Sequence, residues 1–160
     1  MTREAGVRRH DWQRATPADA GPLTDLERDA NLVGLAHVFG ELPFPYDAVL
    51  TRWVLLLDDP EVVTEVVVGD SGLVALAAYD PDSLRHLAVH PDAWGRGMAR
   101  DGVRRAVDAG ATRLWVLTEN HRARGLYETL GWSPTGVTQE CPWAPHPIEL
   151  EYRLALGSSV

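Results

Sequence analysis

The spacing of apolar residues predicts a short strand and a long helix at the start of the chain. Residues 11–15 are expected to be extended. Thr16 is a favoured N-cap residue, Pro17 suits the first helical position, and Asp19 completes a capping box with Thr16. The apolar positions that follow recur at helical spacing as far as about Asn31. The buried side of this helix is predicted to consist of Ala20, Leu23, Leu26 and Ala30.

A second helix and three strands are predicted after the proline-broken loop at residues 41–47. From Tyr46 to Leu57 the apolar side chains again recur at helical spacing, and the acidic and proline residues 58–60 end that helix. Three short apolar segments, separated by turn residues, then predict consecutive antiparallel strands. These strands are Val62–Val68, Leu73–Tyr79 and Leu84–Val89.

The rest of the chain predicts two helices that alternate with strands. A glycine-containing turn at residues 90–97 leads into a helix that buries Val103 and Ala106 and ends at Gly110. A shorter helix is closed by Gly131. The fold class is therefore α/β, with a mixed, mostly antiparallel sheet of about seven strands flanked by about four helices. The remaining strands are predicted at Arg113–Thr118, Trp132–Thr138 and Ile148–Leu156.

Length and composition are those of one globular domain that spans residues 1–160. The chain has 160 residues, of which 45% are hydrophobic and 24% charged. Residues 1–10 are polar and expected to be flexible. No apolar run approaches the ~18 residues of a membrane span, and no signal peptide is recognised, so we expect a cytoplasmic protein without a membrane partner. The single cysteine, Cys141, excludes an internal disulfide and a zinc cage, and no metal site is predicted.

Charge excludes several classes of function. All 15 basic residues are arginine, which we take as a GC-rich, bacterial coding bias. The missing lysine excludes a phosphate-loop lysine and a Schiff-base lysine. The net charge of -8 disfavours nucleic-acid binding. The segment 83–124 nevertheless holds eight arginines against four acidic residues, which favours a local site for a polyanion.

The glycine turn combines the end of a strand, two glycines and the start of a helix. The first turn of a helix has N–H groups without internal partners, and the helix dipole favours negative charge there. Gly95 and Gly97 place no side chain in front of these groups, while Arg96 and Arg100 add positive charge. The pattern predicts a phosphate-binding turn, with a tight turn that binds nothing as the alternative. It is neither a Walker A loop, which needs lysine, nor a dinucleotide fingerprint, whose third glycine is replaced by Arg100.

Residues 84–132 resemble the GNAT family of N-acetyltransferases. The segment 87–99, LAVHPDAWGRGMA, is similar to that family's acyl-CoA signature, whose turn reads Gln/Arg-x-x-Gly-x-Gly/Ala. The segment 120–132, NHRARGLYETLGW, resembles the family's N-x-x-A-x-x-x-Y-x-x-x-G-F pattern. The order of the two segments and the preceding hairpin strands also agree. One departure is Trp94, which stands at the Gln/Arg position of the turn.

The resemblance implies an N-acetyltransferase that uses acetyl-CoA as its co-substrate. The strands at 84–89 and 113–118 are then the two central parallel strands, which diverge and admit the pantetheine arm. A backbone N–H of the first strand polarises the thioester carbonyl, and Tyr127 protonates the departing thiolate. Tyr127 as a core tyrosine and Asn120 as a plain N-cap are the alternatives. The implied acetyl-CoA site consists of Leu87, Ala88, Val89, Gly95, Arg96, Gly97, Met98, Ala99, Arg100, Asn120 and Tyr127.

The general base is left open by the sequence. Members of the family often carry glutamate or histidine on the strand before the turn, but the comparable position here is Arg85, which cannot accept a proton. His86, Glu119, His121 and a chain of water molecules are the candidates. By strand alternation, His86 is expected to point away from the site unless a bulge rotates it.

The acceptor is expected to be the amine of a small molecule or a peptide. The segments 43–46 and 142–147 are rich in proline and aromatic residues, and we predict that they wall the acceptor pocket. Two further hypotheses keep the cofactor turn: an enzyme with another acyl donor or a hydroxyl acceptor, and a CoA-binding domain without catalysis. A homodimer is an additional hypothesis, in which an exposed tryptophan marks the shared face.

Overall fold

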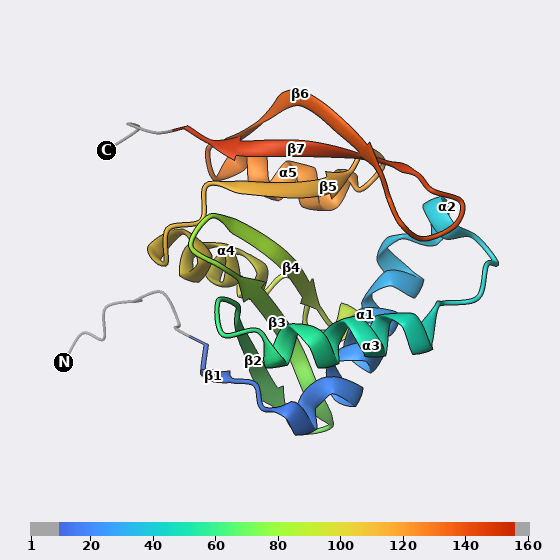
Figure 1. Cartoon of the computed structure of the whole chain (residues 1–160), viewed down its shortest axis with the longest axis vertical. Coiled ribbons are helices and arrows are strands. Elements are labelled where there is room, and N and C mark those ends of the chain that lie inside the picture. The colour runs from blue at the N-terminus through green and yellow to red at the C-terminus, as the bar shows by residue number, and fades with distance from the viewer. Residues whose placement is uncertain (1–9, 156–160) are drawn as a thin grey trace.

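The computed structural model describes residues 10–155 and is built around one seven-stranded sheet with the strand order β1-β2-β3-β4-β5-β7-β6 (Figure 1). All neighbouring strands are antiparallel except β4 and β5, which are parallel. The predicted α/β class with a mixed, mostly antiparallel sheet is confirmed. The strands are β1 (Trp12–Arg14), β2 (Val63–Gly69), β3 (Gly72–Tyr79), β4 (Ser83–Val89), β5 (Arg113–Leu117), β6 (Trp132–Glu140) and β7 (Ile148–Leu154).

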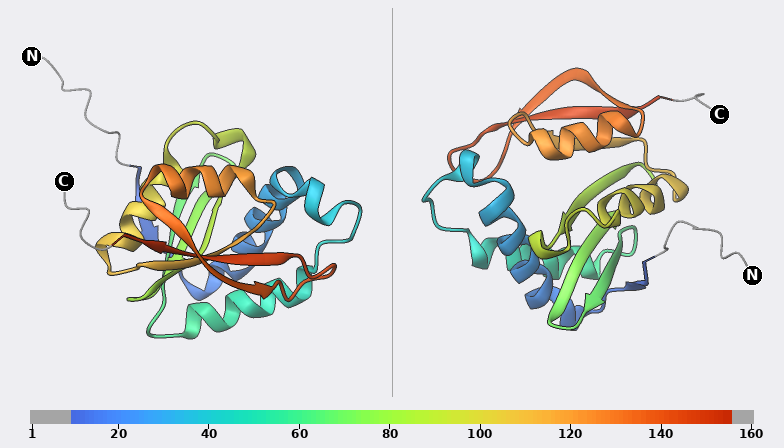
Figure 2. Two further views of the ribbon diagram at one scale, coloured as in Figure 1. Left: turned by 90° about the horizontal axis from the view of Figure 1, so that it is seen from above. Right: turned by 180° about the vertical axis from the view of Figure 1, so that it is seen from behind.

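Helices cover both faces of the sheet. One hydrophobic core joins α1 and α3 to β2 and β3, and a second joins α4 and α5 to the opposite face; the left view of Figure 2 shows α3 separated from α4 and α5 by the strands. None of the helices within residues 10–155 is long and apolar enough to cross a membrane. The helices are α1 (Ala20–Gly34), α2 (Ala36–Phe39), α3 (Tyr46–Asp58), α4 (Met98–Asp108) and α5 (His121–Thr129), with single 3-10 turns at Pro17–Asp19 and Pro91–Ala93.

The start of α1 differs from the prediction, whereas its buried side agrees. The N–H of Thr16 donates to Asp19 Oδ2 at 2.8 Å, but this contact caps a 3-10 turn, and the α-helix itself begins at Ala20. The four apolar residues predicted to be buried are all buried, and the helix runs on to Gly34. The sequence does not predict α2, because a single turn of four residues is too short to show a periodicity.

Helix α4 lies unusually close to β4. A methyl group added at Gly102 would stand 2.7 Å from Cδ1 of Leu87 and 3.3 Å from the ring of Trp12. Gly102 therefore lets the helix approach the strand without a side chain between them. Val103 and Ala106, on the predicted stripe, are buried at this contact.

The parallel strands β4 and β5 pair only at their beginnings. Ser83 lies opposite Arg113 and Leu84 opposite Leu114, and no further pair follows. At the same point the pairing of β4 with β3 shifts, because Tyr79 faces Leu84 while Ala78 faces His86. A bulge at Arg85 accounts for that shift. The structure thus contains the predicted divergence of the two central strands.

The carboxylate of Asp80 stabilises the turn before β4, at the end where β4 and β5 pair. Its Oδ1 accepts the N–H groups of Asp82 and Ser83, each at 2.8 Å, and its Oδ2 accepts Nε of Arg85 at 2.6 Å. The carbonyl of Asp82 in turn accepts the N–H of Thr112 at 2.9 Å, just before β5. Asp80 therefore fixes the turn that brings β4 beside β5.

Replacing Asp80 with asparagine is expected to lower the free energy of unfolding by roughly 1.5–3 kcal/mol near neutral pH, because bonds to a charged acceptor are lost. Burial alone would raise the pKa of Asp80, but Arg85 and the N–H donors lower it below the ordinary value. The carboxylate thus stabilises the fold above the ordinary pKa of aspartate, and this contribution is lost as the pH falls through the lowered pKa. Urea unfolding at neutral and strongly acidic pH measures both effects. Equal stability of the two proteins at neutral pH would contradict this role.

Candidate active site

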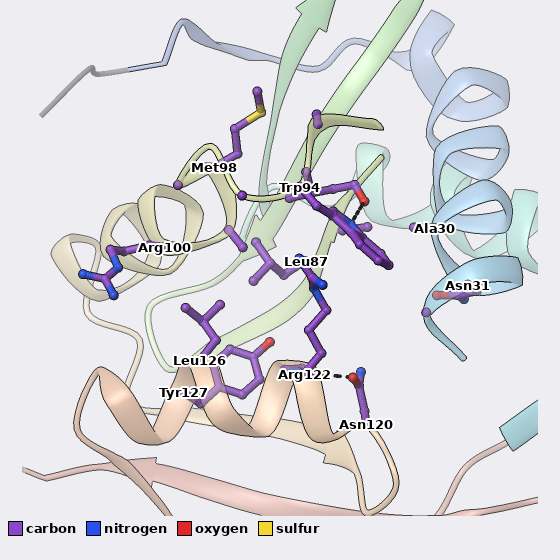
Figure 3. Close-up of a pocket in the computed structure, with 18 of the residues that line it drawn as sticks. Ala30, Asn31, Leu87, Trp94, Met98, Arg100, Asn120, Arg122, Leu126 and Tyr127 are labelled. Atoms are coloured by element: carbon purple, nitrogen blue, oxygen red, sulfur yellow. Dashed lines mark hydrogen bonds between the residues drawn. The ribbon is translucent and has the colours of Figure 1, made fainter. Parts of the chain in front are cut away.

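A cavity of about 390 Å³ opens where β4 and β5 separate. Its walls come from the end of β4, the glycine turn, the first turn of α4, helix α5 and the last turns of α1 (Figure 3). The lining residues are Ala30, Asn31, Gly34, Leu35, Leu87, Ala88, Val89, Ala93, Trp94, Gly95, Gly97, Met98, Ala99, Arg100, Asn120, Arg122, Ala123, Leu126 and Tyr127.

The glycine turn presents the N-terminus of α4 to this cavity. Gly97 is the N-cap of the helix with φ of 80°, and Gly95 also has φ of 80°, a region that other residues rarely occupy. The first helical bond is donated by the N–H of Asp101 to the carbonyl of Gly97 at 3.0 Å. The N–H groups of the first turn precede that bond and have no helical acceptor. With the helix dipole behind them, they form an anion-binding surface without side chains in front.

The structure brings together all but one of the residues predicted for acetyl-CoA. The strand residues Leu87, Ala88 and Val89 form one wall, the glycine turn and the start of α4 form the next, and α5 forms the wall opposite. Arg96 is the exception: it does not line the cavity, and its guanidinium lies 3.4 Å from the carbonyl of Asp92 on the exposed side of the turn. The prediction that the Arg96 side chain contributes to the site is not supported by this placement.

Tyr127 is the predicted proton donor, and it projects from α5 into the cavity. The residue is 7% exposed, and its ring lies 6.4 Å from the rings of Trp132 and Tyr152. Figure 3 shows its hydroxyl pointing away from α5 towards Leu87, and within residues 10–155 this hydroxyl makes no hydrogen bond. Burial raises the pKa of Tyr127 far above its ordinary value, so the phenol keeps its proton.

Asn120 is an N-cap residue, which was the alternative to a role in binding, and it also lines the cavity. Its Oδ1 accepts the N–H of Ala123 at 3.2 Å, so it is the N-cap of α5. The same side chain lies at the edge of the cavity (Figure 3). Capping fixes the direction of α5, and α5 carries Tyr127.

Two residues that line the cavity, and that sequence analysis did not place together, stack on each other. The indole N–H of Trp94 donates to the carbonyl of Val89 at 2.8 Å, and the guanidinium carbon of Arg122 lies 3.8 Å from the centre of the Trp94 ring. Trp94 follows β4 and Arg122 lies in the first turn of α5, so the pair connects the two walls. The sequence placed Arg122 in the basic segment but did not predict that it stacks on Trp94. Stacking between residues far apart in the chain leaves no local sequence pattern.

None of the side chains proposed as the general base lines the cavity. His86 points away from the cavity, as expected from strand alternation, although a bulge at Arg85 precedes it; it packs against Trp53 on the α1 and α3 side of the sheet, with ring centres 5.2 Å apart. Burial, together with Arg52 and Arg85, holds the pKa of His86 well below its ordinary value. Glu119 and His121 pair with each other at 3.1 Å on the exposed start of α5.

A second cavity, of about 260 Å³, adjoins the first, and Asn31 and Leu35 line both. The two proline-rich segments predicted to wall an acceptor pocket meet here: Pro43, Phe44 and Pro45 lie on one side and the segment 142–144 on the other. Helix α1 supplies the wall between the cavities. Sequence analysis did not predict this contribution, because the exposed side of α1 has no motif.

Comparisons with known proteins agree with this architecture. The model of the acetyltransferase (GNAT) family matches residues 3–132. No curated protein matches the sequence. Among solved structures, apo YjaB from Escherichia coli has a TM-score of 0.71 at 18% identity, covering 91% of this chain and 97% of that one.

Two similar structures contain coenzyme A or acetyl-CoA. The PaiA N-acetyltransferase of Thermoplasma acidophilum, in complex with coenzyme A, has a TM-score of 0.64 at 13% identity and covers 89% of this chain and 98% of that one. YncA of Salmonella typhimurium, with acetyl-CoA, has a TM-score of 0.65 at 16% identity and covers 94% of this chain and 95% of that one. At these identities the likeness shows the fold.

Proposed function

Because the chain belongs to the GNAT family of acetyltransferases, we propose that it transfers the acetyl group of acetyl-CoA to the amine of a small molecule or peptide. The observation that carries the proposal is the cavity between the end of β4 and helix α5, which is lined by an anion-binding helix start and by Tyr127. The complexes of PaiA with coenzyme A and of YncA with acetyl-CoA support the choice of co-substrate.

The residues of the cavity fit coenzyme A. The first-turn N–H groups of α4 are suited to its diphosphate, and Arg100 and Arg122 add positive charge beside them. A Cβ added at Gly95 would meet no protein atom within 4 Å, so this glycine leaves open space beside the helix start, which suits a diphosphate. The apolar side chains of Leu87, Val89 and Leu126 suit the pantetheine arm and the acetyl group.

The transfer requires a polarised carbonyl, an uncharged amine and a protonated leaving group. After Leu84, β4 has lost its partner on the β5 side, so N–H groups of β4 that face the cavity are available to the thioester oxygen. The amine nitrogen forms a bond to the carbonyl carbon, and the bond from that carbon to sulfur breaks. Tyr127 donates its proton to the departing sulfur, and the amine loses its own proton to a base.

Release of the free thiol from acetyl-CoA, measured against a panel of amines, tests this proposal. We expect thiol release that depends on at least one amine and an acetylated amine as its product. The panel includes peptides, polyamines, amino sugars and hydrophobic amines, with alcohols as hydroxyl acceptors and propionyl-CoA as another donor. Thiol release with alcohols alone would support the hydroxyl alternative. Coenzyme A binding without turnover of any member would support a domain that binds but does not catalyse.

A further inference from the structure

The second cavity has almost no charged lining. Its walls are mainly aliphatic, aromatic and proline side chains, and Glu27 is the only ionisable residue among those of residues 10–155 that line it. Phe39 and Phe44 come from the segment after α1, and Trp143 from the loop between β6 and β7. Such a surface favours a ligand whose body is hydrocarbon.

This cavity leads directly to the predicted site of chemistry. Asn31 on α1 and Leu35 directly after it line both cavities, so a ligand in the second cavity reaches the first past these two residues. Glu27 lies four residues before Asn31 on the same helix, and residues with this spacing share a helix face. Glu27 therefore lines the second cavity alone, and Asn31, one helical turn further on, lines both cavities.

Glu27 is buried, and only one of its two carboxylate oxygens has a hydrogen-bond partner within residues 10–155. The residue is 9% exposed, and its Oε1 lies 2.5 Å from a guanidinium nitrogen of Arg52 on α3. Its other oxygen, Oε2, accepts no hydrogen bond within residues 10–155. Arg52 lies over the ring of Trp53, 5.0 Å from its centre, and does not line the cavity. A ligand in the cavity thus meets Glu27 and not its counter-ion.

The pKa of Glu27 depends on its burial and on one neighbouring cation. Arg52 from α3 is the charged partner, and His86 from β4, whose own pKa is lowered by Arg52, lies beyond it. The residues of the two proline-rich segments that line the cavity, at 43–45 and 142–144, carry no charge. Burial raises the pKa of Glu27, and Arg52 only partly offsets that increase.

We propose that the acceptor is a primary monoamine on an alkyl or aromatic skeleton, that the second cavity holds this skeleton, and that Glu27 binds its ammonium group and receives its proton. This inference rests on the proposed acetyl transfer. The carboxylate takes one proton from the ammonium, and the neutral amine then forms the bond to the acetyl carbon. Glu27 returns that proton to solvent after the product leaves. A polyamine or amino sugar would place further cations against uncharged walls, where none is compensated.

A homologous series of straight-chain primary amines tests the substrate class. We expect kcat/KM for acetylation to rise about fourfold for each added methylene until the cavity is filled, and phenylethylamine to be accepted. Polyamines and amino sugars are expected to be poor acceptors. Acetylation of polyamines or polar peptides in preference to alkylamines would overturn this inference while leaving the proposed function intact. Absence of acetyl transfer to every amine would instead refute the proposed function.

The pH profile of Glu27→Gln tests the carboxylate. In the wild type, kcat/KM for hexylamine is expected to fall in acid as Glu27 is protonated and to stay level towards neutral pH. In the variant, we expect a loss of roughly 10²-fold at neutral pH and a rate that follows the concentration of neutral amine, rising with pH. A variant with the wild-type profile would overturn the role of Glu27.

Two controls separate binding from folding. Asp29→Asn removes the same charge from α1 at a residue that lines neither cavity, and its pH profile is expected to match the wild type. Trp143→Ala enlarges the second cavity without changing charge and is expected to move the preferred chain length upward. If Trp143→Ala leaves the chain-length series unchanged, the skeleton is not held in this cavity.

Discussion

Replacing Tyr127 with phenylalanine is expected to lower kcat for acetyl transfer by roughly 10²- to 10⁴-fold, the usual contribution of a positioned acid. The hydroxyl is the only group removed, and within residues 10–155 it bonds to nothing, so the fold loses no hydrogen bond. The ring remains packed against Trp132 and Tyr152. The affinity for coenzyme A, measured by calorimetry, is therefore expected to stay within about twofold of the wild type.

The matched control for this change is Tyr152→Phe. Tyr152 packs against Tyr127, but its hydroxyl accepts Nε of Arg124 at 2.8 Å, and the residue does not line the cavity. We expect this variant to lose some stability and to keep most of its kcat. If Tyr127→Phe keeps its rate, the phenol is not the proton donor. If both variants lose the rate equally, packing and not proton transfer explains the loss.

Replacing Gly97 with leucine is expected to weaken coenzyme A binding by roughly 10²-fold or more, because charge-assisted bonds to the diphosphate are obstructed. Gly97 has φ of 80°, and a Cβ added there would have only His10 nearby, 4.0 Å away, so the new side chain extends into the open turn. The unfavourable φ costs a further 1–2 kcal/mol of stability by rough estimate. Calorimetric titration of coenzyme A and urea unfolding separate the two effects.

Gly136→Leu is the matched control for Gly97→Leu, because it places leucine at another glycine with positive φ that lies outside the turn. Gly136 lies in β6 with φ of 93°, and an added Cβ would meet nothing within 4 Å. A similar loss of stability with normal coenzyme A binding is expected. Should Gly97→Leu bind coenzyme A as well as Gly136→Leu does, the diphosphate is not held at this turn.

Much of the fold was predictable because its signals are local. The buried stripe of α1, the three hairpin strands and the glycine turn each depend on residues within a few positions of one another. The same locality explains why the turn and the segment 120–127 identified most of the cavity: each contributes one wall, and of the residues predicted for acetyl-CoA only Arg96 does not line it.

The features that sequence reasoning missed depend on contacts between distant segments. Arg122 stacks on Trp94 only because α5 faces the glycine turn, and Glu27 meets Arg52 only because α1 packs on α3. Neither polarity nor spacing along the chain reports such contacts, so the contribution of α1 and Glu27 to the second cavity emerged only from the folded structure.

The most direct test is a calorimetric comparison of coenzyme A with pantetheine, which has the same thiol arm but lacks the diphosphate and the nucleotide. The first-turn N–H groups of α4 are predicted to bind coenzyme A at one site per chain, with a Kd below roughly 1 mM. Pantetheine is predicted to bind far more weakly. Equal affinity for the two compounds, or no binding of coenzyme A, would contradict the assignment of this turn as the diphosphate site.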